Sequence, residues 1–180
     1  MAPKSLSELN TLKRSSQVTS NIYNKVYKHL IMSTIDKEKK VKHTKLANEV
    51  ENSVSDREKT GVVPDLLESA YPPIIQSGGN FALKFSAQAD ETNLHFGVIV
   101  CMLGMRYRSY CSNIARVLMV NPSDSITKNY EKLLNLHEQL LNLVKPGKKC
   151  CEVYEEIIEK CPEKFRNNLT KNFGSVIGIE

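Results

Sequence analysis

The sequence has 180 residues and a mass of 20.3 kDa, about the size of one domain. Hydrophobic residues make up 41% and charged residues 25%, which is an ordinary globular composition. No apolar run approaches the roughly 20 residues that span a membrane, the first 20 residues lack the apolar core of a signal peptide, and the five cysteines show no Cys-x-x-Cys spacing. These features argue against a membrane protein, a secreted disulfide scaffold and a zinc finger.

The net charge of +5 lies entirely in the first third of the chain. Residues 1–60 contain 12 Lys and Arg against 7 Asp and Glu, whereas residues 61–180 contain 13 of each. Such asymmetry can mark a segment that contacts nucleic acid. A solvated helix face is the favoured interpretation, because glutamates lie among the lysines and no aromatic residues interleave with them. The densest group of lysines is Lys37, Lys39, Lys40, Lys42 and Lys45.

In chain order, the first predicted element is a helix from Ser5 to Ile35, where apolar residues recur three and four residues apart. The polar stretch 36–42 ends this helix, and a second, short helix is predicted from Thr44 to Asn52. Residues 53–73 contain a glycine and three prolines, a composition that predicts a connecting loop.

The next fifty residues change to a strand-like pattern. Between the turn sequences Ser-Gly-Gly-Asn and Asp-Glu-Thr-Asn, alternating apolar residues predict a short strand over 83–87. Phe96 to Met105 is a continuous apolar run, typical of a strand that is buried on both faces. Tyr107 to Val120 is rich in aromatic and β-branched residues and predicts a further strand.

The last third returns to helices. A turn at 121–123 caps a helix whose apolar stripe runs from Tyr130 to Val144, and another helix is predicted over 149–161. Phe173 to Ile179 predicts a glycine-spaced strand with no partner strand after it, which indicates a piece of a longer protein. The order α-α-β-β-β-α-α-β predicts an α+β architecture.

Nucleophiles, bases and metal ligands do not form a local motif. None of the four histidines lies two to four residues from another, and His137, on the apolar stripe, is predicted to be a hydrogen-bonded core residue. A cysteine nucleophile would need Cys101 or Cys111 beside a histidine in space, whereas a lone cysteine on a strand is usually a packing residue. The other histidines are His29, His43 and His95.

Three short motifs carry a family resemblance. Residues 110–116, Tyr-Cys-Ser-Asn-Ile-Ala-Arg, resemble the Gly-Tyr-x-Ser-Asp-Ile-Thr-Arg strand of the creatinase, prolidase and methionine aminopeptidase proteins. Residues 77–80 resemble the Ser-Gly-x-Asn turn of these proteins, and residues 174–178, Gly-Ser-Val-Ile-Gly, resemble their Gly-His-Gly-Ile-Gly strand. The resemblance implies the α+β "pita-bread" fold of this superfamily, truncated here in its second half.

The sequence is more similar still to one catalytically inactive branch, the large subunits of FACT histone chaperones. The ten-residue run at 71–80, Tyr-Pro-Pro-Ile-Ile-Gln-Ser-Gly-Gly-Asn, is highly specific for that branch. The resemblance covers roughly residues 20–180. It implies an N-terminal helical or linker segment over 1–20 and a peptidase-like domain over 21–180 that is incomplete at its C-terminus. Further similar segments are 83–86, 109–113, 118–120 and 170–172.

The resemblance also locates the positions of a metal centre. Active members of the superfamily bind two metal ions through two aspartates eleven residues apart, one histidine and two later glutamates, a hard ligand set that suits Mn or Co. This sequence has Met102 and Asn113 at the aspartate positions, Ser175 at the position of the metal-binding histidine, and Phe85 at that of the substrate-binding histidine. The two glutamates would lie beyond Glu180. The resemblance therefore implies no catalytic residues, no metal and no other cofactor.

The function that the resemblance implies is a non-catalytic, histone-binding module of a FACT-type chaperone. Such a module would act on core histones and nucleosomes, in the nucleus and on chromosomes, during transcription, replication and repair. The smaller FACT subunit would bind through regions absent here, Lys37 to Lys45 would make non-specific contacts with DNA phosphates, and no membrane is involved. The histone-binding residues stay open. The alternatives are an active metal-dependent aminopeptidase or prolidase-like hydrolase, and a domain that only packs against neighbouring domains.

Overall fold

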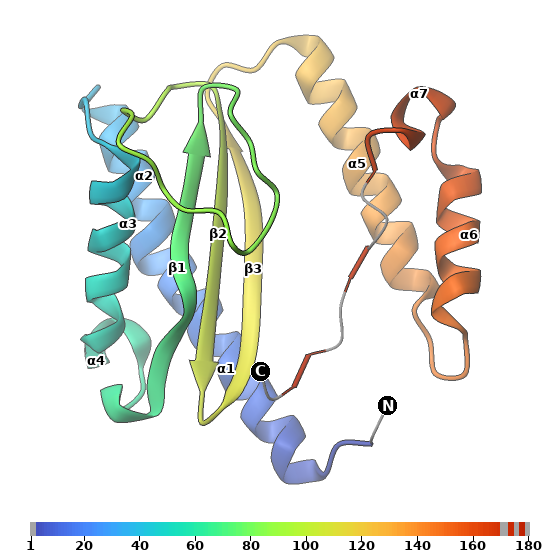
Figure 1. Ribbon diagram of the computed structural model, residues 1–180, viewed down its shortest axis with the longest axis horizontal. Coiled ribbons are helices and arrows are strands. Elements are labelled where there is room, and N and C mark those ends of the chain that lie inside the picture. The colour runs from blue at the N-terminus through green and yellow to red at the C-terminus, as the bar shows by residue number, and fades with distance from the viewer. Residues whose placement is uncertain (1–2, 170–172, 175–176, 179–180) are drawn as a thin grey trace. The chain divides into compact units, whose positions relative to one another are not determined.

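The computed structural model describes residues 3–169, 173–174 and 177–178 and divides the chain into two compact units (Figure 1). The first unit comprises residues 1–121 with 177–180, and the second comprises residues 122–176. No helix within the described ranges has both the length and the apolar character that crossing a bilayer requires. The predicted division at residue 20 falls inside the first helix and stays a prediction.

The first unit contains a layer of helices and one antiparallel sheet, and the second unit contains helices. The helical segments of the first unit are α1 (Leu6–Ile22), the π-helical turn η1 (Tyr23–Tyr27), α2 (Lys28–Asp36), α3 (His43–Asn52), the 3₁₀ turn η2 (Ser53–Ser55), α4 (Arg57–Thr60) and the 3₁₀ turn η3 (Pro64–Leu66). Its strands are β1 (Leu67–Ser77), β2 (Val98–Tyr107) and β3 (Tyr110–Met119). The helices of the second unit are α5 (Asp124–Leu143), α6 (Cys150–Lys160) and α7 (Glu163–Arg166).

The helix predicted from Ser5 to Ile35 is present, with a π-helical turn near its middle. Ser5 begins it with a capping box, in which the Ser5 side chain accepts from the Glu8 N–H and the Glu8 carboxylate accepts from the Ser5 N–H. In η1 the rings of Tyr23 and Tyr27 stack with centroids 5.6 Å apart. A wider turn keeps residues four apart on one face, so Tyr23, Tyr27 and Ile31 all lie in the core.

The sheet has the order β1-β2-β3, and both pairs are antiparallel. The central strand β2 is buried along almost its whole length, as the apolar run at 96–105 predicted. The prediction of a loop over 53–73 is wrong in its last part, because β1 passes through Tyr71, Pro72 and Pro73. Register shifts on either side of Tyr71 accommodate the prolines. Among the described residues β1 has one neighbouring strand, so the missing proline N–H groups do not break a central ladder there.

The short strand predicted over 83–87 does not form. The segment has no strand partner, since β1 pairs directly with β2, and Leu83 is 66% exposed. The alternation of apolar residues there has a different origin, because Ala87 packs against the sheet and Phe85 against the Tyr71 ring, while Leu83 is exposed. The sheet nevertheless has three strands, with residues 67–77 as the first of them.

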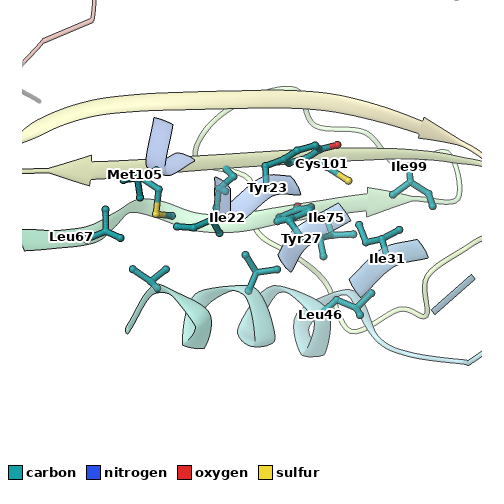
Figure 2. Close-up of a cluster of buried hydrophobic side chains, with 14 of the residues drawn as sticks. Ile22, Tyr23, Tyr27, Ile31, Leu46, Leu67, Ile75, Ile99, Cys101 and Met105 are labelled. Carbon is teal, nitrogen blue, oxygen red and sulfur yellow. The ribbon is translucent and has the colours of Figure 1, made fainter. Parts of the chain in front are cut away.

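The main hydrophobic core lies between the helices and one face of the sheet (Figure 2). Tyr27 is at its centre, fully buried, and its hydroxyl donates to the Ile74 carbonyl oxygen of β1. Burial holds the pKa of Tyr27 well above its usual value, so this hydroxyl remains a donor. The largest buried apolar side chains around it are Ile22, Ile31, Leu46, Ile75, Ile99, Leu103 and Met105.

The predicted helices of the second unit are confirmed. Ser123 caps α5 by accepting from the Ile126 N–H, and α6 matches the helix predicted over 149–161. The predicted strand from Phe173 to Ile179 lies partly outside the described residues. The segment 170–172, which the resemblance to FACT proteins includes, lies outside them as well. In the described part, the carbonyl oxygen of Gly178 accepts from the Cys111 N–H of β3 at 3.0 Å.

Candidate functional site

Within the first unit, the sheet turns one face to helices α1–α3 and the other, here called the open face, away from them (Figure 1). In register, Met102 of β2 lies between Ile74 of β1 and Ala115 of β3, and Gly104 pairs with Asn113. Because side chains of directly paired residues share a face, Met102 and Asn113 both lie on the open face, two positions apart along the sheet. The pair of positions that the resemblance assigned to metal-binding aspartates is therefore brought together.

A long connection, residues 78–97 and here called the strap, joins β1 to β2 and crosses the open face (Figure 1). Ala87 forms a second small core with Ile74, Val100 and Met102, and Ala82 packs against it. The Ala82 N–H donates to Oε1 of Gln76 at 3.0 Å. The strap is thus an ordered covering of this face, built without helix or strand.

Tyr71 occupies the centre of the open face. A Cβ atom on Gly104 would overlap its Cε1, so the ring lies directly on the backbone opposite Asn113. The Phe85 ring of the strap packs against it with centroids 5.2 Å apart. The Tyr71 hydroxyl is buried and makes no hydrogen bond with any described residue, and burial raises the pKa of Tyr71 far above its usual value.

The residues at the family's metal positions do not fit a pair of hard divalent ions. Met102 offers a thioether and Asn113 a neutral amide oxygen, so neither supplies the negative charge that the ions require. Phe85 can neither bind a metal nor transfer a proton, and Ser175 lies outside the described residues. Elsewhere in the described ranges, no three His, Cys, Asp or Glu side chains come together as a metal site. Around Tyr71 the open face therefore presents aromatic, apolar and amide groups, and the ion pair between Arg106 and Glu68 lies farther along the same face.

A polar cluster forms around the buried His43, with Ser77 buried and Asp90 half exposed, and its residues were not predicted to meet. His43, at the first position of α3, is 1% exposed. Its Nδ1 lies 2.6 Å from Oδ1 of Asp90 and its Nε2 lies 2.7 Å from Oγ of Ser77. Hydrogen bonds from Thr92 and His43 lower the pKa of Asp90. Ser77 and Asp90 lie 34 and 47 residues after His43 in sequence, so no local spacing could have revealed the cluster.

The other residues with potential chemistry remain dispersed. His29 and His95 are exposed, and so is His137, which corrects its prediction as a core residue, because α5 has no buried residue. Burial raises the pKa of Cys101 to about 12, so this thiol cannot supply the thiolate that a nucleophile needs. Cys111 is buried on β3.

The basic group of the sequence lies mostly in the α2–α3 connection. All five of its lysines are exposed. Lys42 is neutralised by an ion pair with Glu91 at 2.8 Å. The members of the group are Lys37, Lys39, Lys40, Lys42 and Lys45.

Replacing Gly104 with alanine is expected to destabilise the protein by about 1–3 kcal/mol, because the added methyl group would displace the Tyr71 ring. In a Tyr71→Leu background the same change should cost much less or become slightly stabilising, since glycine is unfavourable in a strand. Urea denaturation of the four proteins of this cycle measures the coupling. Equal costs in the two backgrounds would contradict the contact between Tyr71 and Gly104.

Comparison with known proteins identifies relatives over nearly the whole chain. A model of metallopeptidase family M24 matches residues 10–180. The FACT complex subunit SPT16 of Yarrowia lipolytica is 35% identical over 186 residues, which cover 96% of this chain and 18% of that protein. The FACT complex subunit SPT16 of Oryza sativa subsp. japonica is 35% identical over 187 residues, which cover 99% of this chain and 18% of that protein. The chain therefore spans less than a fifth of the length of these relatives.

Solved structures give the same result for the fold. The N-terminal domain of FACT complex subunit SPT16 from Cicer arietinum superimposes with a TM-score of 0.93 at 36% identity, covering 99% of this chain and 44% of that one. The X-Pro aminopeptidase of Thermotoga maritima MSB8 superimposes with a TM-score of 0.72 at 22% identity, covering 98% of this chain and 47% of that one, and this likeness shows the fold alone. The predicted α+β pita-bread fold and the predicted resemblance to FACT proteins are both confirmed.

Proposed function

The chain belongs to metallopeptidase family M24, and we propose that within this family it is a non-catalytic, histone-binding module of a FACT-type histone chaperone. The whole chaperone would reorganise nucleosomes during transcription, replication and repair. It would act in the nucleus, on chromosomes, with core histones and nucleosomes as partners. The smaller FACT subunit would bind through regions outside this chain. Residues 21–180 would form the peptidase-like part, preceded by the segment 1–20.

The observation that supports this proposal most is the composition of the open face. An aminopeptidase needs carboxylates that hold metal ions and an accessible volume above them. Here Met102 and Asn113 stand at the carboxylate positions, and the Tyr71 ring lies on Gly104 beside them. The alternative, an active aminopeptidase or prolidase-like hydrolase, would require a ligand set that these side chains cannot supply.

The same face has groups suited to binding a basic peptide without cleaving it. The Phe85 ring is 50% exposed and lies against Tyr71, so it offers an aromatic surface to the stem and cation of a lysine or arginine side chain. Asn113 is exposed and carries both a donor and an acceptor for a peptide backbone. Histone tails are rich in lysine and arginine, and such contacts would favour their binding.

The test is a titration of the full-length protein with purified core histones and with their tailless forms. Weak binding of intact histones, reduced by removal of the tails or by Phe85→Ala, is the expected result. Leu83→Ala is the matched control, because Leu83 is an exposed strap residue that is not part of the Tyr71–Phe85 pair. Turnover of a proline dipeptide in the presence of Mn, or no histone binding at all, would contradict the proposal.

DNA contacts are expected to come from the lysines and to be non-specific in sequence. Replacing Lys37, Lys39 and Lys40 together with alanine should weaken binding to unrelated DNA duplexes and reduce the slope of log K against log salt by up to about 3, close to one for each phosphate contact. Histone binding by the open face should change little. The measurement is a titration at two salt concentrations. A preference for one DNA sequence at high salt would contradict this prediction.

A further inference from the structure

The beginning of the strap and its second half meet at the side chain of His43. Ser77, which bonds to Nε2, is the residue immediately before the strap. Asp90, which bonds to Nδ1, lies in its returning half. The His95 N–H, close to the end of the strap, donates to the same Ser77 Oγ at 2.8 Å. The His43 imidazole therefore links Ser77, at the end of β1, to Asp90, in the second half of the strap.

The hydrogen bonds in this cluster have one consistent direction. An ionised Asp90 can only accept, so Nδ1 of His43 carries the hydrogen and, in the neutral ring, Nε2 is the acceptor. Ser77 then donates its hydroxyl hydrogen to Nε2 and accepts from the His95 N–H. Thr92 donates both its backbone N–H and its hydroxyl to Asp90. Both ring nitrogens of the buried His43 and the buried Ser77 hydroxyl are thereby paired, so breaking these bonds would leave buried polar atoms without partners.

The returning half of the strap is well anchored. Leu94 is buried in the main core, and backbone bonds run from Leu94 N–H to Val41, from Thr44 N–H to Asp90 and from His43 N–H to Thr92. At the end of the strap, the Gly97 carbonyl oxygen accepts from the Val120 N–H.

The middle of the strap, residues 78–90, is held more weakly. It is attached by the Ala82 bond to Gln76, by small alanine contacts and by the Tyr71–Phe85 ring pair. The contacts of Ala87 that cover Val100 and Met102 thus depend on the hydrogen bonds of the His43 side chain.

We propose that His43 is the positioning residue that keeps the strap closed over the open face, and that the middle of the strap, residues 78–90, opens as one unit when the bonds of His43 are lost. Opening removes Ala87 from Val100 and Met102 and exposes this apolar surface of β2. The strap is therefore a conformational device that controls access to the sheet. This inference goes beyond the proposed function and does not depend on which partner binds.

The test uses the full-length protein and trypsin cleavage after Lys84, an exposed residue in the middle of the strap. His43→Asn keeps a donor near Nδ1 for Asp90 but removes the bond to Ser77, and it should raise the cleavage rate at Lys84 about tenfold. Ser77→Ala, which removes only the Oγ atom, should have a similar effect. His29→Asn is the matched control, because it makes the same change at an exposed histidine of α2 and should leave the rate unchanged.

Cleavage at Lys13 and Arg14 in α1 distinguishes local opening from global unfolding. An increase at Lys84 alone, in either variant, supports the proposal. An unchanged rate at Lys84, or an increase there that is matched in α1, overturns it. If His43→Asn does not fold, Ser77→Ala decides between these outcomes. Hydrogen exchange in the wild-type protein gives an independent readout, since the amides of residues 78–90 should exchange as one group and faster than those of β2.

Discussion

Replacing Met102 with aspartate, the residue that the family resemblance implies for this position in active peptidases, is expected to lower the free energy of unfolding by about 3–5 kcal/mol. Met102 is 8% exposed and packs against Ile74, Ala87 and Val100, so a carboxylate there would be buried among apolar groups without a partner. Mn should not restore the lost stability, because no described side chain nearby supplies the remaining ligands.

Met102→Leu is the matched control for this substitution. It conserves volume and apolar character and should cost less than about 1.5 kcal/mol. Urea denaturation of both variants, with and without Mn, separates the cost of the charge from the cost of repacking. An aspartate variant as stable as the leucine variant, or one that Mn stabilises in a saturable way, would show that the open face can still hold a metal.

Replacing Tyr27 with alanine is expected to cost about 3–5 kcal/mol, because the side chain is fully buried at the centre of the main core. The substitution removes the stacking with Tyr23 and the contact that joins η1 to β1 through Ile74. The packing of the helical layer on the sheet should therefore weaken as a whole.

Tyr27→Phe isolates the hydrogen bond from the packing. It keeps the ring and removes only the hydroxyl, so it should cost about 0.5–1.5 kcal/mol. Thermal and urea denaturation of the full-length protein measure both variants. If phenylalanine were as costly as alanine, the bond to Ile74, and not the filling of the core, would hold the helices on the sheet.

Periodicity alone located most helices and the central strand, since these elements depend on residues close in sequence. The stripe from Tyr130 to Val144 and the apolar run at 96–105 correspond to α5 and β2. The first strand was missed because its two prolines are typical of a loop. They are tolerated because β1 pairs with one strand among the described residues and shifts its register at Tyr71. The alternation at 83–87 was misleading, because a strand also needs a partner.

The sequence by itself determined that the chain has the pita-bread fold, and its resemblance to the family implies that Met102, Asn113 and Phe85 stand where a peptidase needs charged or basic ligands. These conclusions required only the identity of side chains at motif positions, and the chemistry of a thioether, an amide and a phenyl ring is independent of the fold. Only the tertiary structure decided that Tyr71 covers Gly104 and that Ser77, His43 and Asp90 meet. Their contacts join segments more than thirty residues apart, and such distances are set by how the strap and α3 pack on the sheet and not by local sequence.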